Sequence, residues 1–240
     1  MTGYIEKVQQ LIGEAGEAAV PVLKGAAGEL AARLSRGGII QLFGSGHSQL
    51  LAQEGFYRAG SLVPVRPISI GPLMLHEGAV SSSMYEKDPA FSRSFLDKLD
   101  IRPEDAVIII STSGRNPVPL DVAEYAAAQG AYTVSLQSLR YTEQEHPSRH
   151  ASGRRLEELV AAVLDTQVPP GDAVMQVGGV QCGPVSSVIG NTLLHALFCE
   201  TVAAMEADGR TPPVFKSGNL EGNAEYNEKL VAAYSGRIKF

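Results

Sequence analysis

Apolar residues recur at helical spacing near the start of the chain and in short runs after it. Residues 4–34 carry apolar side chains every three or four positions, which predicts one or two amphipathic helices, with Pro21 expected to kink or split the segment. The runs that follow are short and alternate with segments of helical period. They cover residues 38–43, 62–70, 105–111, 131–137, 160–166 and 173–177. Strand followed by helix, repeated along the chain, predicts a parallel sheet.

The run at 105–111, "DAVIIIS", shows no alternation of apolar and polar positions. Such a strand is expected where helices cover both faces of a sheet. With right-handed crossovers, the pattern predicts an α/β fold, a three-layer α/β/α sandwich around a mainly parallel sheet of about five strands. Ligands bind such sheets at the carboxyl ends of the strands.

The remaining segments complete a single domain. Residues 184–205 are apolar nearly all round, which predicts a buried or interface helix, and residues 137–158 form a polar connection. A last short helix is expected at 223–234. The predicted organisation is an N-terminal helical extension at 1–36, an α/β core at 37–206, and a C-terminal loop and helix at 207–240.

Charge and cysteine content narrow the class of partner. The net charge is -6 and the Lys and Arg residues are scattered, so a nucleic-acid footprint is not expected. No apolar run approaches the roughly 18 residues typical of a membrane span. The two cysteines and the absence of a leader pattern predict a cytoplasmic protein with free thiols. Small molecules or copies of the same chain are the expected partners.

The loop "GSGHS" at residues 44–48 follows an apolar strand and opens a helix. Its glycines permit a tight turn, and a helix N-terminus offers unpaired N–H groups to an anion. A dinucleotide site would need a third glycine where Gln49 stands, and neither a Walker Lys nor a G-x-S-x-G nucleophile is present. The sequence therefore predicts a small anion site whose candidate residues are Gly44, Ser45, Gly46, His47 and Ser48. The alternative for His47 is that its side chain is simply exposed on the loop and binds nothing.

A second loop, "STSGRN", also lies between a buried strand and a helix. Ser111, Thr112 and Ser113 stand in succession, and Gly114 turns the chain. One such hydroxyl, or Asn116, could simply cap the helix. Two hydroxyl-rich turns at strand ends favour a shared oxyanion ligand, because neutral donors and helix N-termini can hold a phosphate without Arg or Lys.

These two loops and the Ala-rich helix after the second one resemble the SIS (sugar isomerase) domain family over about residues 37–206. Its members include phosphoheptose isomerase, arabinose-5-phosphate isomerase and N-acetylmuramic acid 6-phosphate etherase. The resemblance implies that Ser45 and Ser48, together with residues 111–113, bind the phosphate or hydroxyls of a phosphosugar. The family often has Ser or Thr where this chain has Asn116, followed by Pro117, so the substrate can differ.

Aldose–ketose isomerisation needs a base and an acid, which directs attention to Glu and His near the loops. His76 and Glu77 resemble a segment after the second strand of arabinose-5-phosphate isomerase; the alternative is a solvated pair. Glu54 lies in the region where phosphoheptose isomerase and the etherase carry a catalytic Glu. In those enzymes the spacing between the loop Ser and the Glu is longer, and in this chain Arg58 stands at that spacing. His195 resembles the catalytic His on the late helix of phosphoheptose isomerase; the alternative is a satisfied core residue.

The same late helix carries Asn191, His195 and Cys199 at intervals of four, which places them in one polar stripe. His195 and Cys199 make half a zinc site at best, so no metal and no cofactor are predicted. His146 and His150 are expected to be solvated unless the polar connection folds over the site.

The leading hypothesis is a phosphosugar-binding protein that isomerises an aldose and a ketose phosphate through an enediol. The alternatives are a non-catalytic phosphosugar sensor, and a lyase or etherase acting on amino-sugar phosphates. The resemblance also implies a homodimer or homotetramer.

Overall fold

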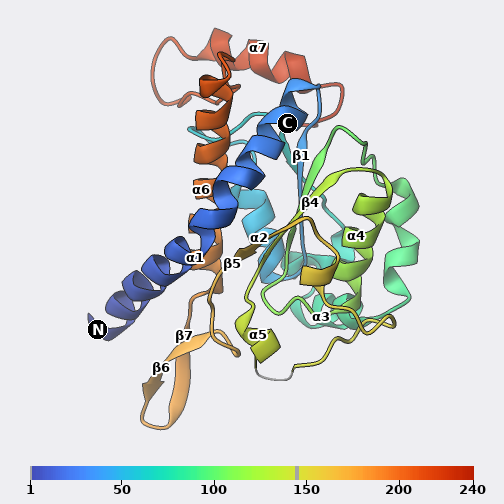
Figure 1. Cartoon of the computed structure of the whole chain (residues 1–240), viewed down its shortest axis with the longest axis vertical. Helices are drawn as coiled ribbons and strands as arrows, with labels where there is room; N and C mark the ends of the chain where they lie inside the picture. The colour runs from blue at the N-terminus through green and yellow to red at the C-terminus, as the bar shows by residue number, and fades with distance from the viewer. Residues whose placement is uncertain (1, 144–145) are drawn as a thin grey trace.

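The computed structural model describes residues 2–143 and 146–240 and contains a five-stranded parallel sheet (Figure 1). Its strand order is β2-β1-β3-β4-β5, and Ile40 and Gly44 of β1 pair with Ala106 and Ile110 of β3. The strands are β1 (Ile40–Gly44), β2 (Val65–Pro67), β3 (Ala106–Ile110), β4 (Tyr132–Gln137) and β5 (Ala162–Asp165). Because the order reverses at β1, the loops after β1 and β3 flank a switch point, where open α/β sheets bind ligands.

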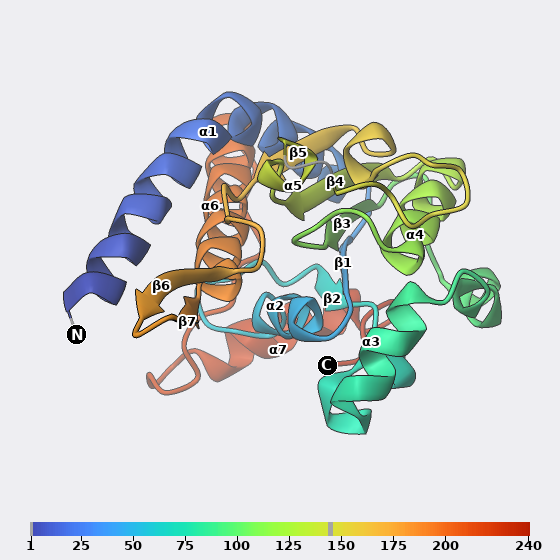
Figure 2. The same cartoon turned by 90° about the horizontal axis from the view of Figure 1, so that it is seen from below.

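Helices cover both faces of the sheet (Figure 2). On one face lie α1 (Thr2–Ser35), α2 (His47–Glu54) and α6 (Ser186–Ala207), and on the other lie α3 (Ala79–Lys87) and α4 (Pro117–Ala128). Ile108 points into the first core cluster, and Val107 and Ile109 point into the second. The expected α/β/α sandwich is thus confirmed, and burial on both faces explains why the β3 run does not alternate.

Of the two expectations for Pro21, a kink or a split, the split is wrong, because α1 continues through that residue. Pro21 is exposed, while Ala15, Ala19 and Ala26 on the opposite side are buried in the core that α1 shares with α6. This packing stabilises both halves of the helix and offsets the one backbone hydrogen bond that proline removes.

The last apolar run is not part of the main sheet. Residues Ala173–Val177 (β6) pair with Val180–Pro184 (β7) in an antiparallel hairpin that projects from the body beside the start of α1. Gly178 and Gly179 both have positive φ, as a two-residue hairpin turn requires. Tyr4 of α1 donates a hydrogen bond of 2.6 Å to the Pro184 carbonyl and fixes the hairpin base.

Two short helices complete the chain, α5 (Arg140–Glu143) and α7 (Ala224–Tyr234); the second confirms the helix expected at 223–234. By length and composition α6 could span a membrane. Leu193, Leu194 and Leu197 on this helix are buried in the core that it shares with α1. The helix therefore packs as a core helix, as its nearly all-round apolar pattern predicted.

Candidate functional site

The first loop turns sharply at the carboxyl end of β1. A Cβ atom on Gly44 would lie 2.4 Å from the Ser48 carbonyl oxygen, so no larger residue fits there. Gly46 has a φ of 56°, a conformation that glycine adopts at little cost. Ser45 is buried, Ser48 is half-buried, and His47 is exposed at the first position of α2. The backbone requirement explains both glycines of the motif.

The second loop is held by neighbours on two sides. Ser111 is buried after β3, while Thr112 and Ser113 are half-buried. Arg155 donates a hydrogen bond of 2.7 Å to the Ser113 carbonyl oxygen. Asn116 donates to Glu86 at 2.7 Å and accepts from Arg149 at 3.2 Å. In this structure the Asn116 side chain thus links α3 and the 146–155 connection to the loop.

A small cavity lies between the two loops, with a volume of about 40 Å³. This volume has room for about three water-sized groups, comparable to the free oxygens of a phosphate. Its lining combines three predicted residues with further groups from α2, β3, β4, the end of β5 and the start of α6. They are His47, Ser48, Leu51, Ile110, Thr112, Leu136, Thr166, Ser186, Ser187 and Gly190.

The sequence pattern did not indicate the hydroxyls of Thr166, Ser186 and Ser187 as part of the site. Thr166 follows β5, so the rule that ligands sit at strand ends could have found it; Ser186 and Ser187 come from a helix distant in sequence. Among the residues that the structure describes, the Thr166 Oγ1 atom is buried and has no hydrogen-bond partner. A buried hydroxyl without a protein partner is costly, so Thr166 Oγ1 is available to bond a polar group, water or ligand, that enters this cavity.

The N-terminus of α6 also faces the cavity, but Asp172 already binds it. The Asp172 Oδ1 atom accepts hydrogen bonds from the Val185 and Ser186 backbone N–H groups at 2.9 and 2.7 Å. The Ser186 hydroxyl donates to Oδ2 at 2.8 Å. This carboxylate takes the place that an anionic ligand would occupy at α6. The side chains that remain to bind an anion in the cavity are those of His47, Ser48, Thr112, Thr166 and Ser187.

Two of the four acid–base candidates meet between α2 and α6. Glu54 is the last residue of α2, and its Oε1 atom lies 3.6 Å from Nε2 of His195 on α6. The side chains are 38% and 34% exposed, but the Nε2 atom of His195 is itself buried and has no hydrogen-bond partner within the described residues. Arg58, one turn beyond Glu54, forms an ion pair with the carboxylate. Burial, and secondarily the charge of Arg58, lowers the pKa of His195 from its usual value of 6.5.

The other two candidates lie apart from that pair. His76 and Glu77 end the 3-10 turn Leu75–Glu77, with Nε2 and Oε1 3.8 Å apart and side chains mostly exposed. The preceding segment contacts the first loop, because the Gly46 N–H donates to the Leu73 carbonyl oxygen at 2.8 Å. The structure thus keeps His76 and Glu77 near the first loop, on its solvent side.

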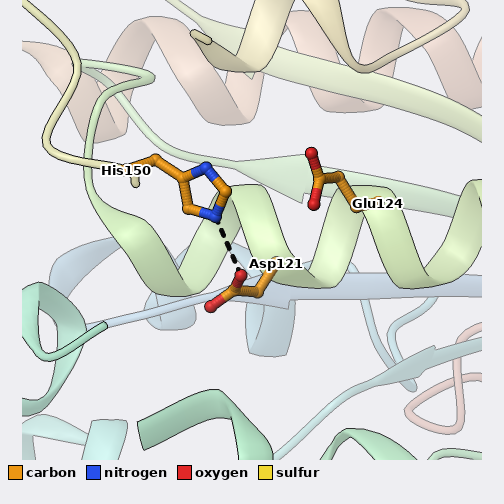
Figure 3. Close-up of side chains that lie close together, drawn as sticks. All are labelled: Asp121, Glu124 and His150. Carbon is orange, nitrogen blue, oxygen red and sulfur yellow. Dashed lines mark hydrogen bonds and ion pairs between the residues drawn. The ribbon is translucent and has the colours of Figure 1, made fainter. Parts of the chain in front are cut away.

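The polar connection folds against the second loop. The Leu156 N–H donates to the Gly114 carbonyl oxygen at 3.0 Å, and the Arg149 N–H donates to the Arg115 carbonyl oxygen at 2.8 Å. His150 is consequently nearly buried, with an 11% exposed side chain bonded to Asp121 (Figure 3). The sequence predicts a solvated His150 unless the polar connection folds over the site. In the structure the connection folds against the second loop, and His150 is mostly buried. His146 is half-buried and packs against the Tyr141 ring.

Comparison with known proteins gives the family. The model of the SIS domain matches residues 3–138. A UPF0309 protein of Geobacillus thermodenitrificans is 52% identical over 90% of this chain and 87% of its own length. Another, of Lysinibacillus sphaericus, is 48% identical over 100% of this chain and 98% of its own.

Two solved structures share the fold. Phosphoheptose isomerase from Neisseria gonorrhoeae is similar with a TM-score of 0.54 and 15% identity, over 85% of this chain and 96% of that one. The enzyme of the same name from Francisella tularensis gives 0.52 and 19%, with the same coverage. The match to the family model covers more than half of the sequence. The chain therefore belongs to the SIS domain family.

Proposed function

We propose that this protein binds a phosphosugar and interconverts its aldose and ketose forms. The observation that carries the proposal is the Glu54–His195 pair, which lies on the same two helices whose first residues line the hydroxyl-rich cavity. Membership of the SIS family and the strand-end position of both loops support a phosphate ligand in that cavity.

The spacing of the two features matches a sugar phosphate. His47 and Ser48 begin α2 at the cavity, and Glu54 ends the same helix. With a rise of 1.5 Å per residue, Glu54 is on the order of 10 Å from the cavity, and His195 is slightly farther along α6. An open-chain sugar of about five to seven carbons, with bonds of about 1.5 Å, spans a comparable distance. Phosphate in the cavity would place the carbonyl end at the pair.

The two side chains suit the two proton transfers of the reaction. In our proposal the Glu54 carboxylate removes the proton from the carbon beside the carbonyl group, which gives an enediol. It then returns a proton to the former carbonyl carbon. His195, whose lowered pKa leaves it neutral at pH 7, moves a proton between the two sugar oxygens. The net change is the exchange of carbonyl and hydroxyl positions.

Further expectations about the protein remain proposals. A homodimer or homotetramer agrees with the half-buried Asn191 and the exposed Val188 and Cys199 on α6, which leave one side of a core helix uncovered in the single chain. We also propose a cytoplasmic protein whose partner is a small-molecule phosphosugar. The isomerisation as written uses no cofactor.

The test combines binding and exchange. Aldose, ketose and amino-sugar phosphates are screened by thermal shift, and stabilising compounds are then followed by NMR in D₂O for exchange at C2. We expect one group of phosphates to stabilise the protein and to exchange. Glu54→Gln should abolish exchange and keep the stabilisation, whereas Glu200→Gln, on α6 outside the pair, should keep both.

Other outcomes would replace the proposal. Stabilisation without exchange or turnover by any ligand would favour a sensor. If the protein cleaves an ether bond of the substrate or eliminates one of its substituents, and does not isomerise it, the etherase or lyase class would be favoured. If no sugar phosphate stabilises the protein, the assignment of the cavity to phosphate is overturned.

A further inference from the structure

A second group of ligand-bearing side chains lies on the opposite face of the sheet from α6. Asp121 and Glu124 are one turn apart on α4, and His150 approaches them from the 146–155 connection (Figure 3). The nearest nitrogen and carboxylate oxygens of the three residues all lie within 4.8 Å of one another. The proposed isomerase mechanism uses none of the three.

Two of these side chains are hydrogen-bonded to hydroxyl groups through the atoms that face away from the cluster. His150 Nδ1 is hydrogen-bonded to Ser152 Oγ at 2.7 Å, and Asp121 Oδ2 accepts a hydrogen bond of 2.5 Å from Ser92. Both side chains are largely buried, with exposed fractions of 11% for His150 and 18% for Asp121. Hydrogen bonds to the far atoms of metal-binding His and carboxylate groups commonly orient them toward the ion. The two side chains are thus held with Nε2 and Oδ1 facing the same point.

We propose that Asp121, Glu124 and His150 bind a divalent transition-metal ion, with Zn²⁺ as the best fit. One imidazole nitrogen and two carboxylates form a mixed N/O set that suits borderline metals, and three protein ligands leave a fourth position for water. Zinc–ligand distances of about 2.0–2.2 Å separate neighbouring tetrahedral ligands by about 3.3 Å. His150 Nε2 and Asp121 Oδ1 are already 3.0 Å apart.

The ion would bind His150 at Nε2, the ring nitrogen that faces Asp121 Oδ1. The other ring nitrogen, Nδ1, is hydrogen-bonded to Ser152 through its Oγ atom at 2.7 Å and its backbone N–H at 3.3 Å. The geometry therefore leaves Nε2 as the metal-binding atom of the ring.

The ion would fasten the connection to α4 beside the second loop. The same connection supplies Arg155, which binds the Ser113 carbonyl oxygen, and Arg149, which binds Asn116. A cross-link at His150 would restrict the movement of both arginines. The proposed role of the ion is thus to stabilise the loop that precedes α4.

The competing explanation is a metal-free hydrogen bond between His150 and Asp121. Glu124 separates the two explanations, because the hydrogen bond does not involve it. Its side chain is 41% exposed and forms an ion pair of 4.0 Å with Arg154. The substitution Glu124→Gln therefore removes one metal ligand and leaves the His150–Asp121 bond and the fold intact.

The experiment measures zinc binding to the tag-free full chain in a Cys182→Ser/Cys199→Ser background, since both thiols are exposed and thiolates are zinc ligands in general. After equilibration with Zn²⁺ and gel filtration, metal content is measured by mass spectrometry and affinity by competition with a chromophoric chelator. We expect one ion per chain and an affinity at least about tenfold weaker in Glu124→Gln. Glu17→Gln, an exposed position on α1, is the matched control and should match the parent.

A second readout identifies the ligands. Co²⁺ in the site should give weak visible absorption without a thiolate charge-transfer band, and Asp121→Asn should abolish it. The proposal is overturned if the parent protein retains no ion at tens of micromolar Zn²⁺. It is equally overturned if Glu124→Gln and Glu17→Gln bind zinc with the same stoichiometry and affinity. Neither result depends on sugar phosphate turnover.

Discussion

The His195 Nε2 atom lies 3.6 Å from Oε1 of Glu54, although the two residues belong to helices far apart in the sequence. The contact places two candidates for acid–base chemistry together and leaves His76 and Glu77 outside the pair. In an isomerisation, a carboxylate can transfer the carbon-bound proton while a neutral imidazole transfers the oxygen-bound proton, provided that both groups contact the same ligand.

The pH dependence of exchange should report His195. Burial, and secondarily the charge of Arg58, lowers the pKa of this imidazole below 6.5, so the neutral form persists into mildly acidic solution. The exchange rate should fall as the pH drops through that lowered pKa. Arg58→Met removes the positive charge and should raise the pKa, which moves the acidic limb of the rate profile to higher pH. NMR titration of the His195 ring proton measures the same shift directly. A pKa that is unchanged in Arg58→Met would contradict the electrostatic explanation.

The lowered pKa of His195 should also affect how the free energy of unfolding depends on pH. As the pH falls through 6.5, the unfolded chain binds a proton at His195 before the folded chain does, because the folded pKa is lowered. This residue therefore makes the free energy of unfolding decrease between pH 6.5 and the folded pKa. His195→Gln should show a shallower loss of stability over this window in urea titrations. Equal slopes for the variant and the parent would contradict the prediction.

Thr166→Val tests the ligand role of the unpaired hydroxyl in the cavity. The substitution keeps the side-chain shape and removes a buried Oγ1 atom that has no partner within the described chain. The free energy of unfolding should stay the same or rise by about 1 kcal/mol, since no hydrogen bond is lost. Affinity for the sugar phosphate should fall by about tenfold, or about 1.4 kcal/mol. Thr192→Val, on the exposed side of α6, is the control and should leave binding unchanged. Unaltered affinity in Thr166→Val would remove this residue from the site.

Gly114→Ala should destabilise the second loop. Gly114 has a φ of 58°, and a Cβ atom there would lie 2.6 Å from the Gln137 side-chain oxygen. Strain at positive φ and displacement of Gln137 should together cost about 1–3 kcal/mol in the free energy of unfolding. Chemical denaturation measures the loss. Gly28→Ala, in α1 with nothing within 4 Å of the added atom, should be neutral or stabilising by comparison. Equal stability of the two variants would show that the loop can adapt.

Most of the fold could be predicted from the sequence, because strand–loop–helix repeats and buried runs are local patterns. The errors came where a local pattern fits two environments. Residues 173–177 have the composition of a sheet strand, but the Gly178–Gly179 turn pairs them with β7 in a hairpin. Pro21 is tolerated in α1 because packing against α6 supports both flanking turns.

The candidate site was less predictable. Loop residues such as Ser48 and Thr112 could be found because their position follows directly from the strands before them. Thr166 follows the edge strand β5, whose neighbours the sequence does not reveal. The contact between His150 and Asp121 depends on how the connection folds over α4, which no local pattern indicates.

The parallel α/β order, the two hydroxyl-rich turns and the glycines that make those turns possible can be predicted from the sequence, since each follows from residues close together in the chain. The contacts of Glu54 with His195, and of Asp121 and Glu124 with His150, arise only in the folded molecule. Such contacts depend on the relative placement of whole helices and loops. That placement results from packing summed over the two hydrophobic cores.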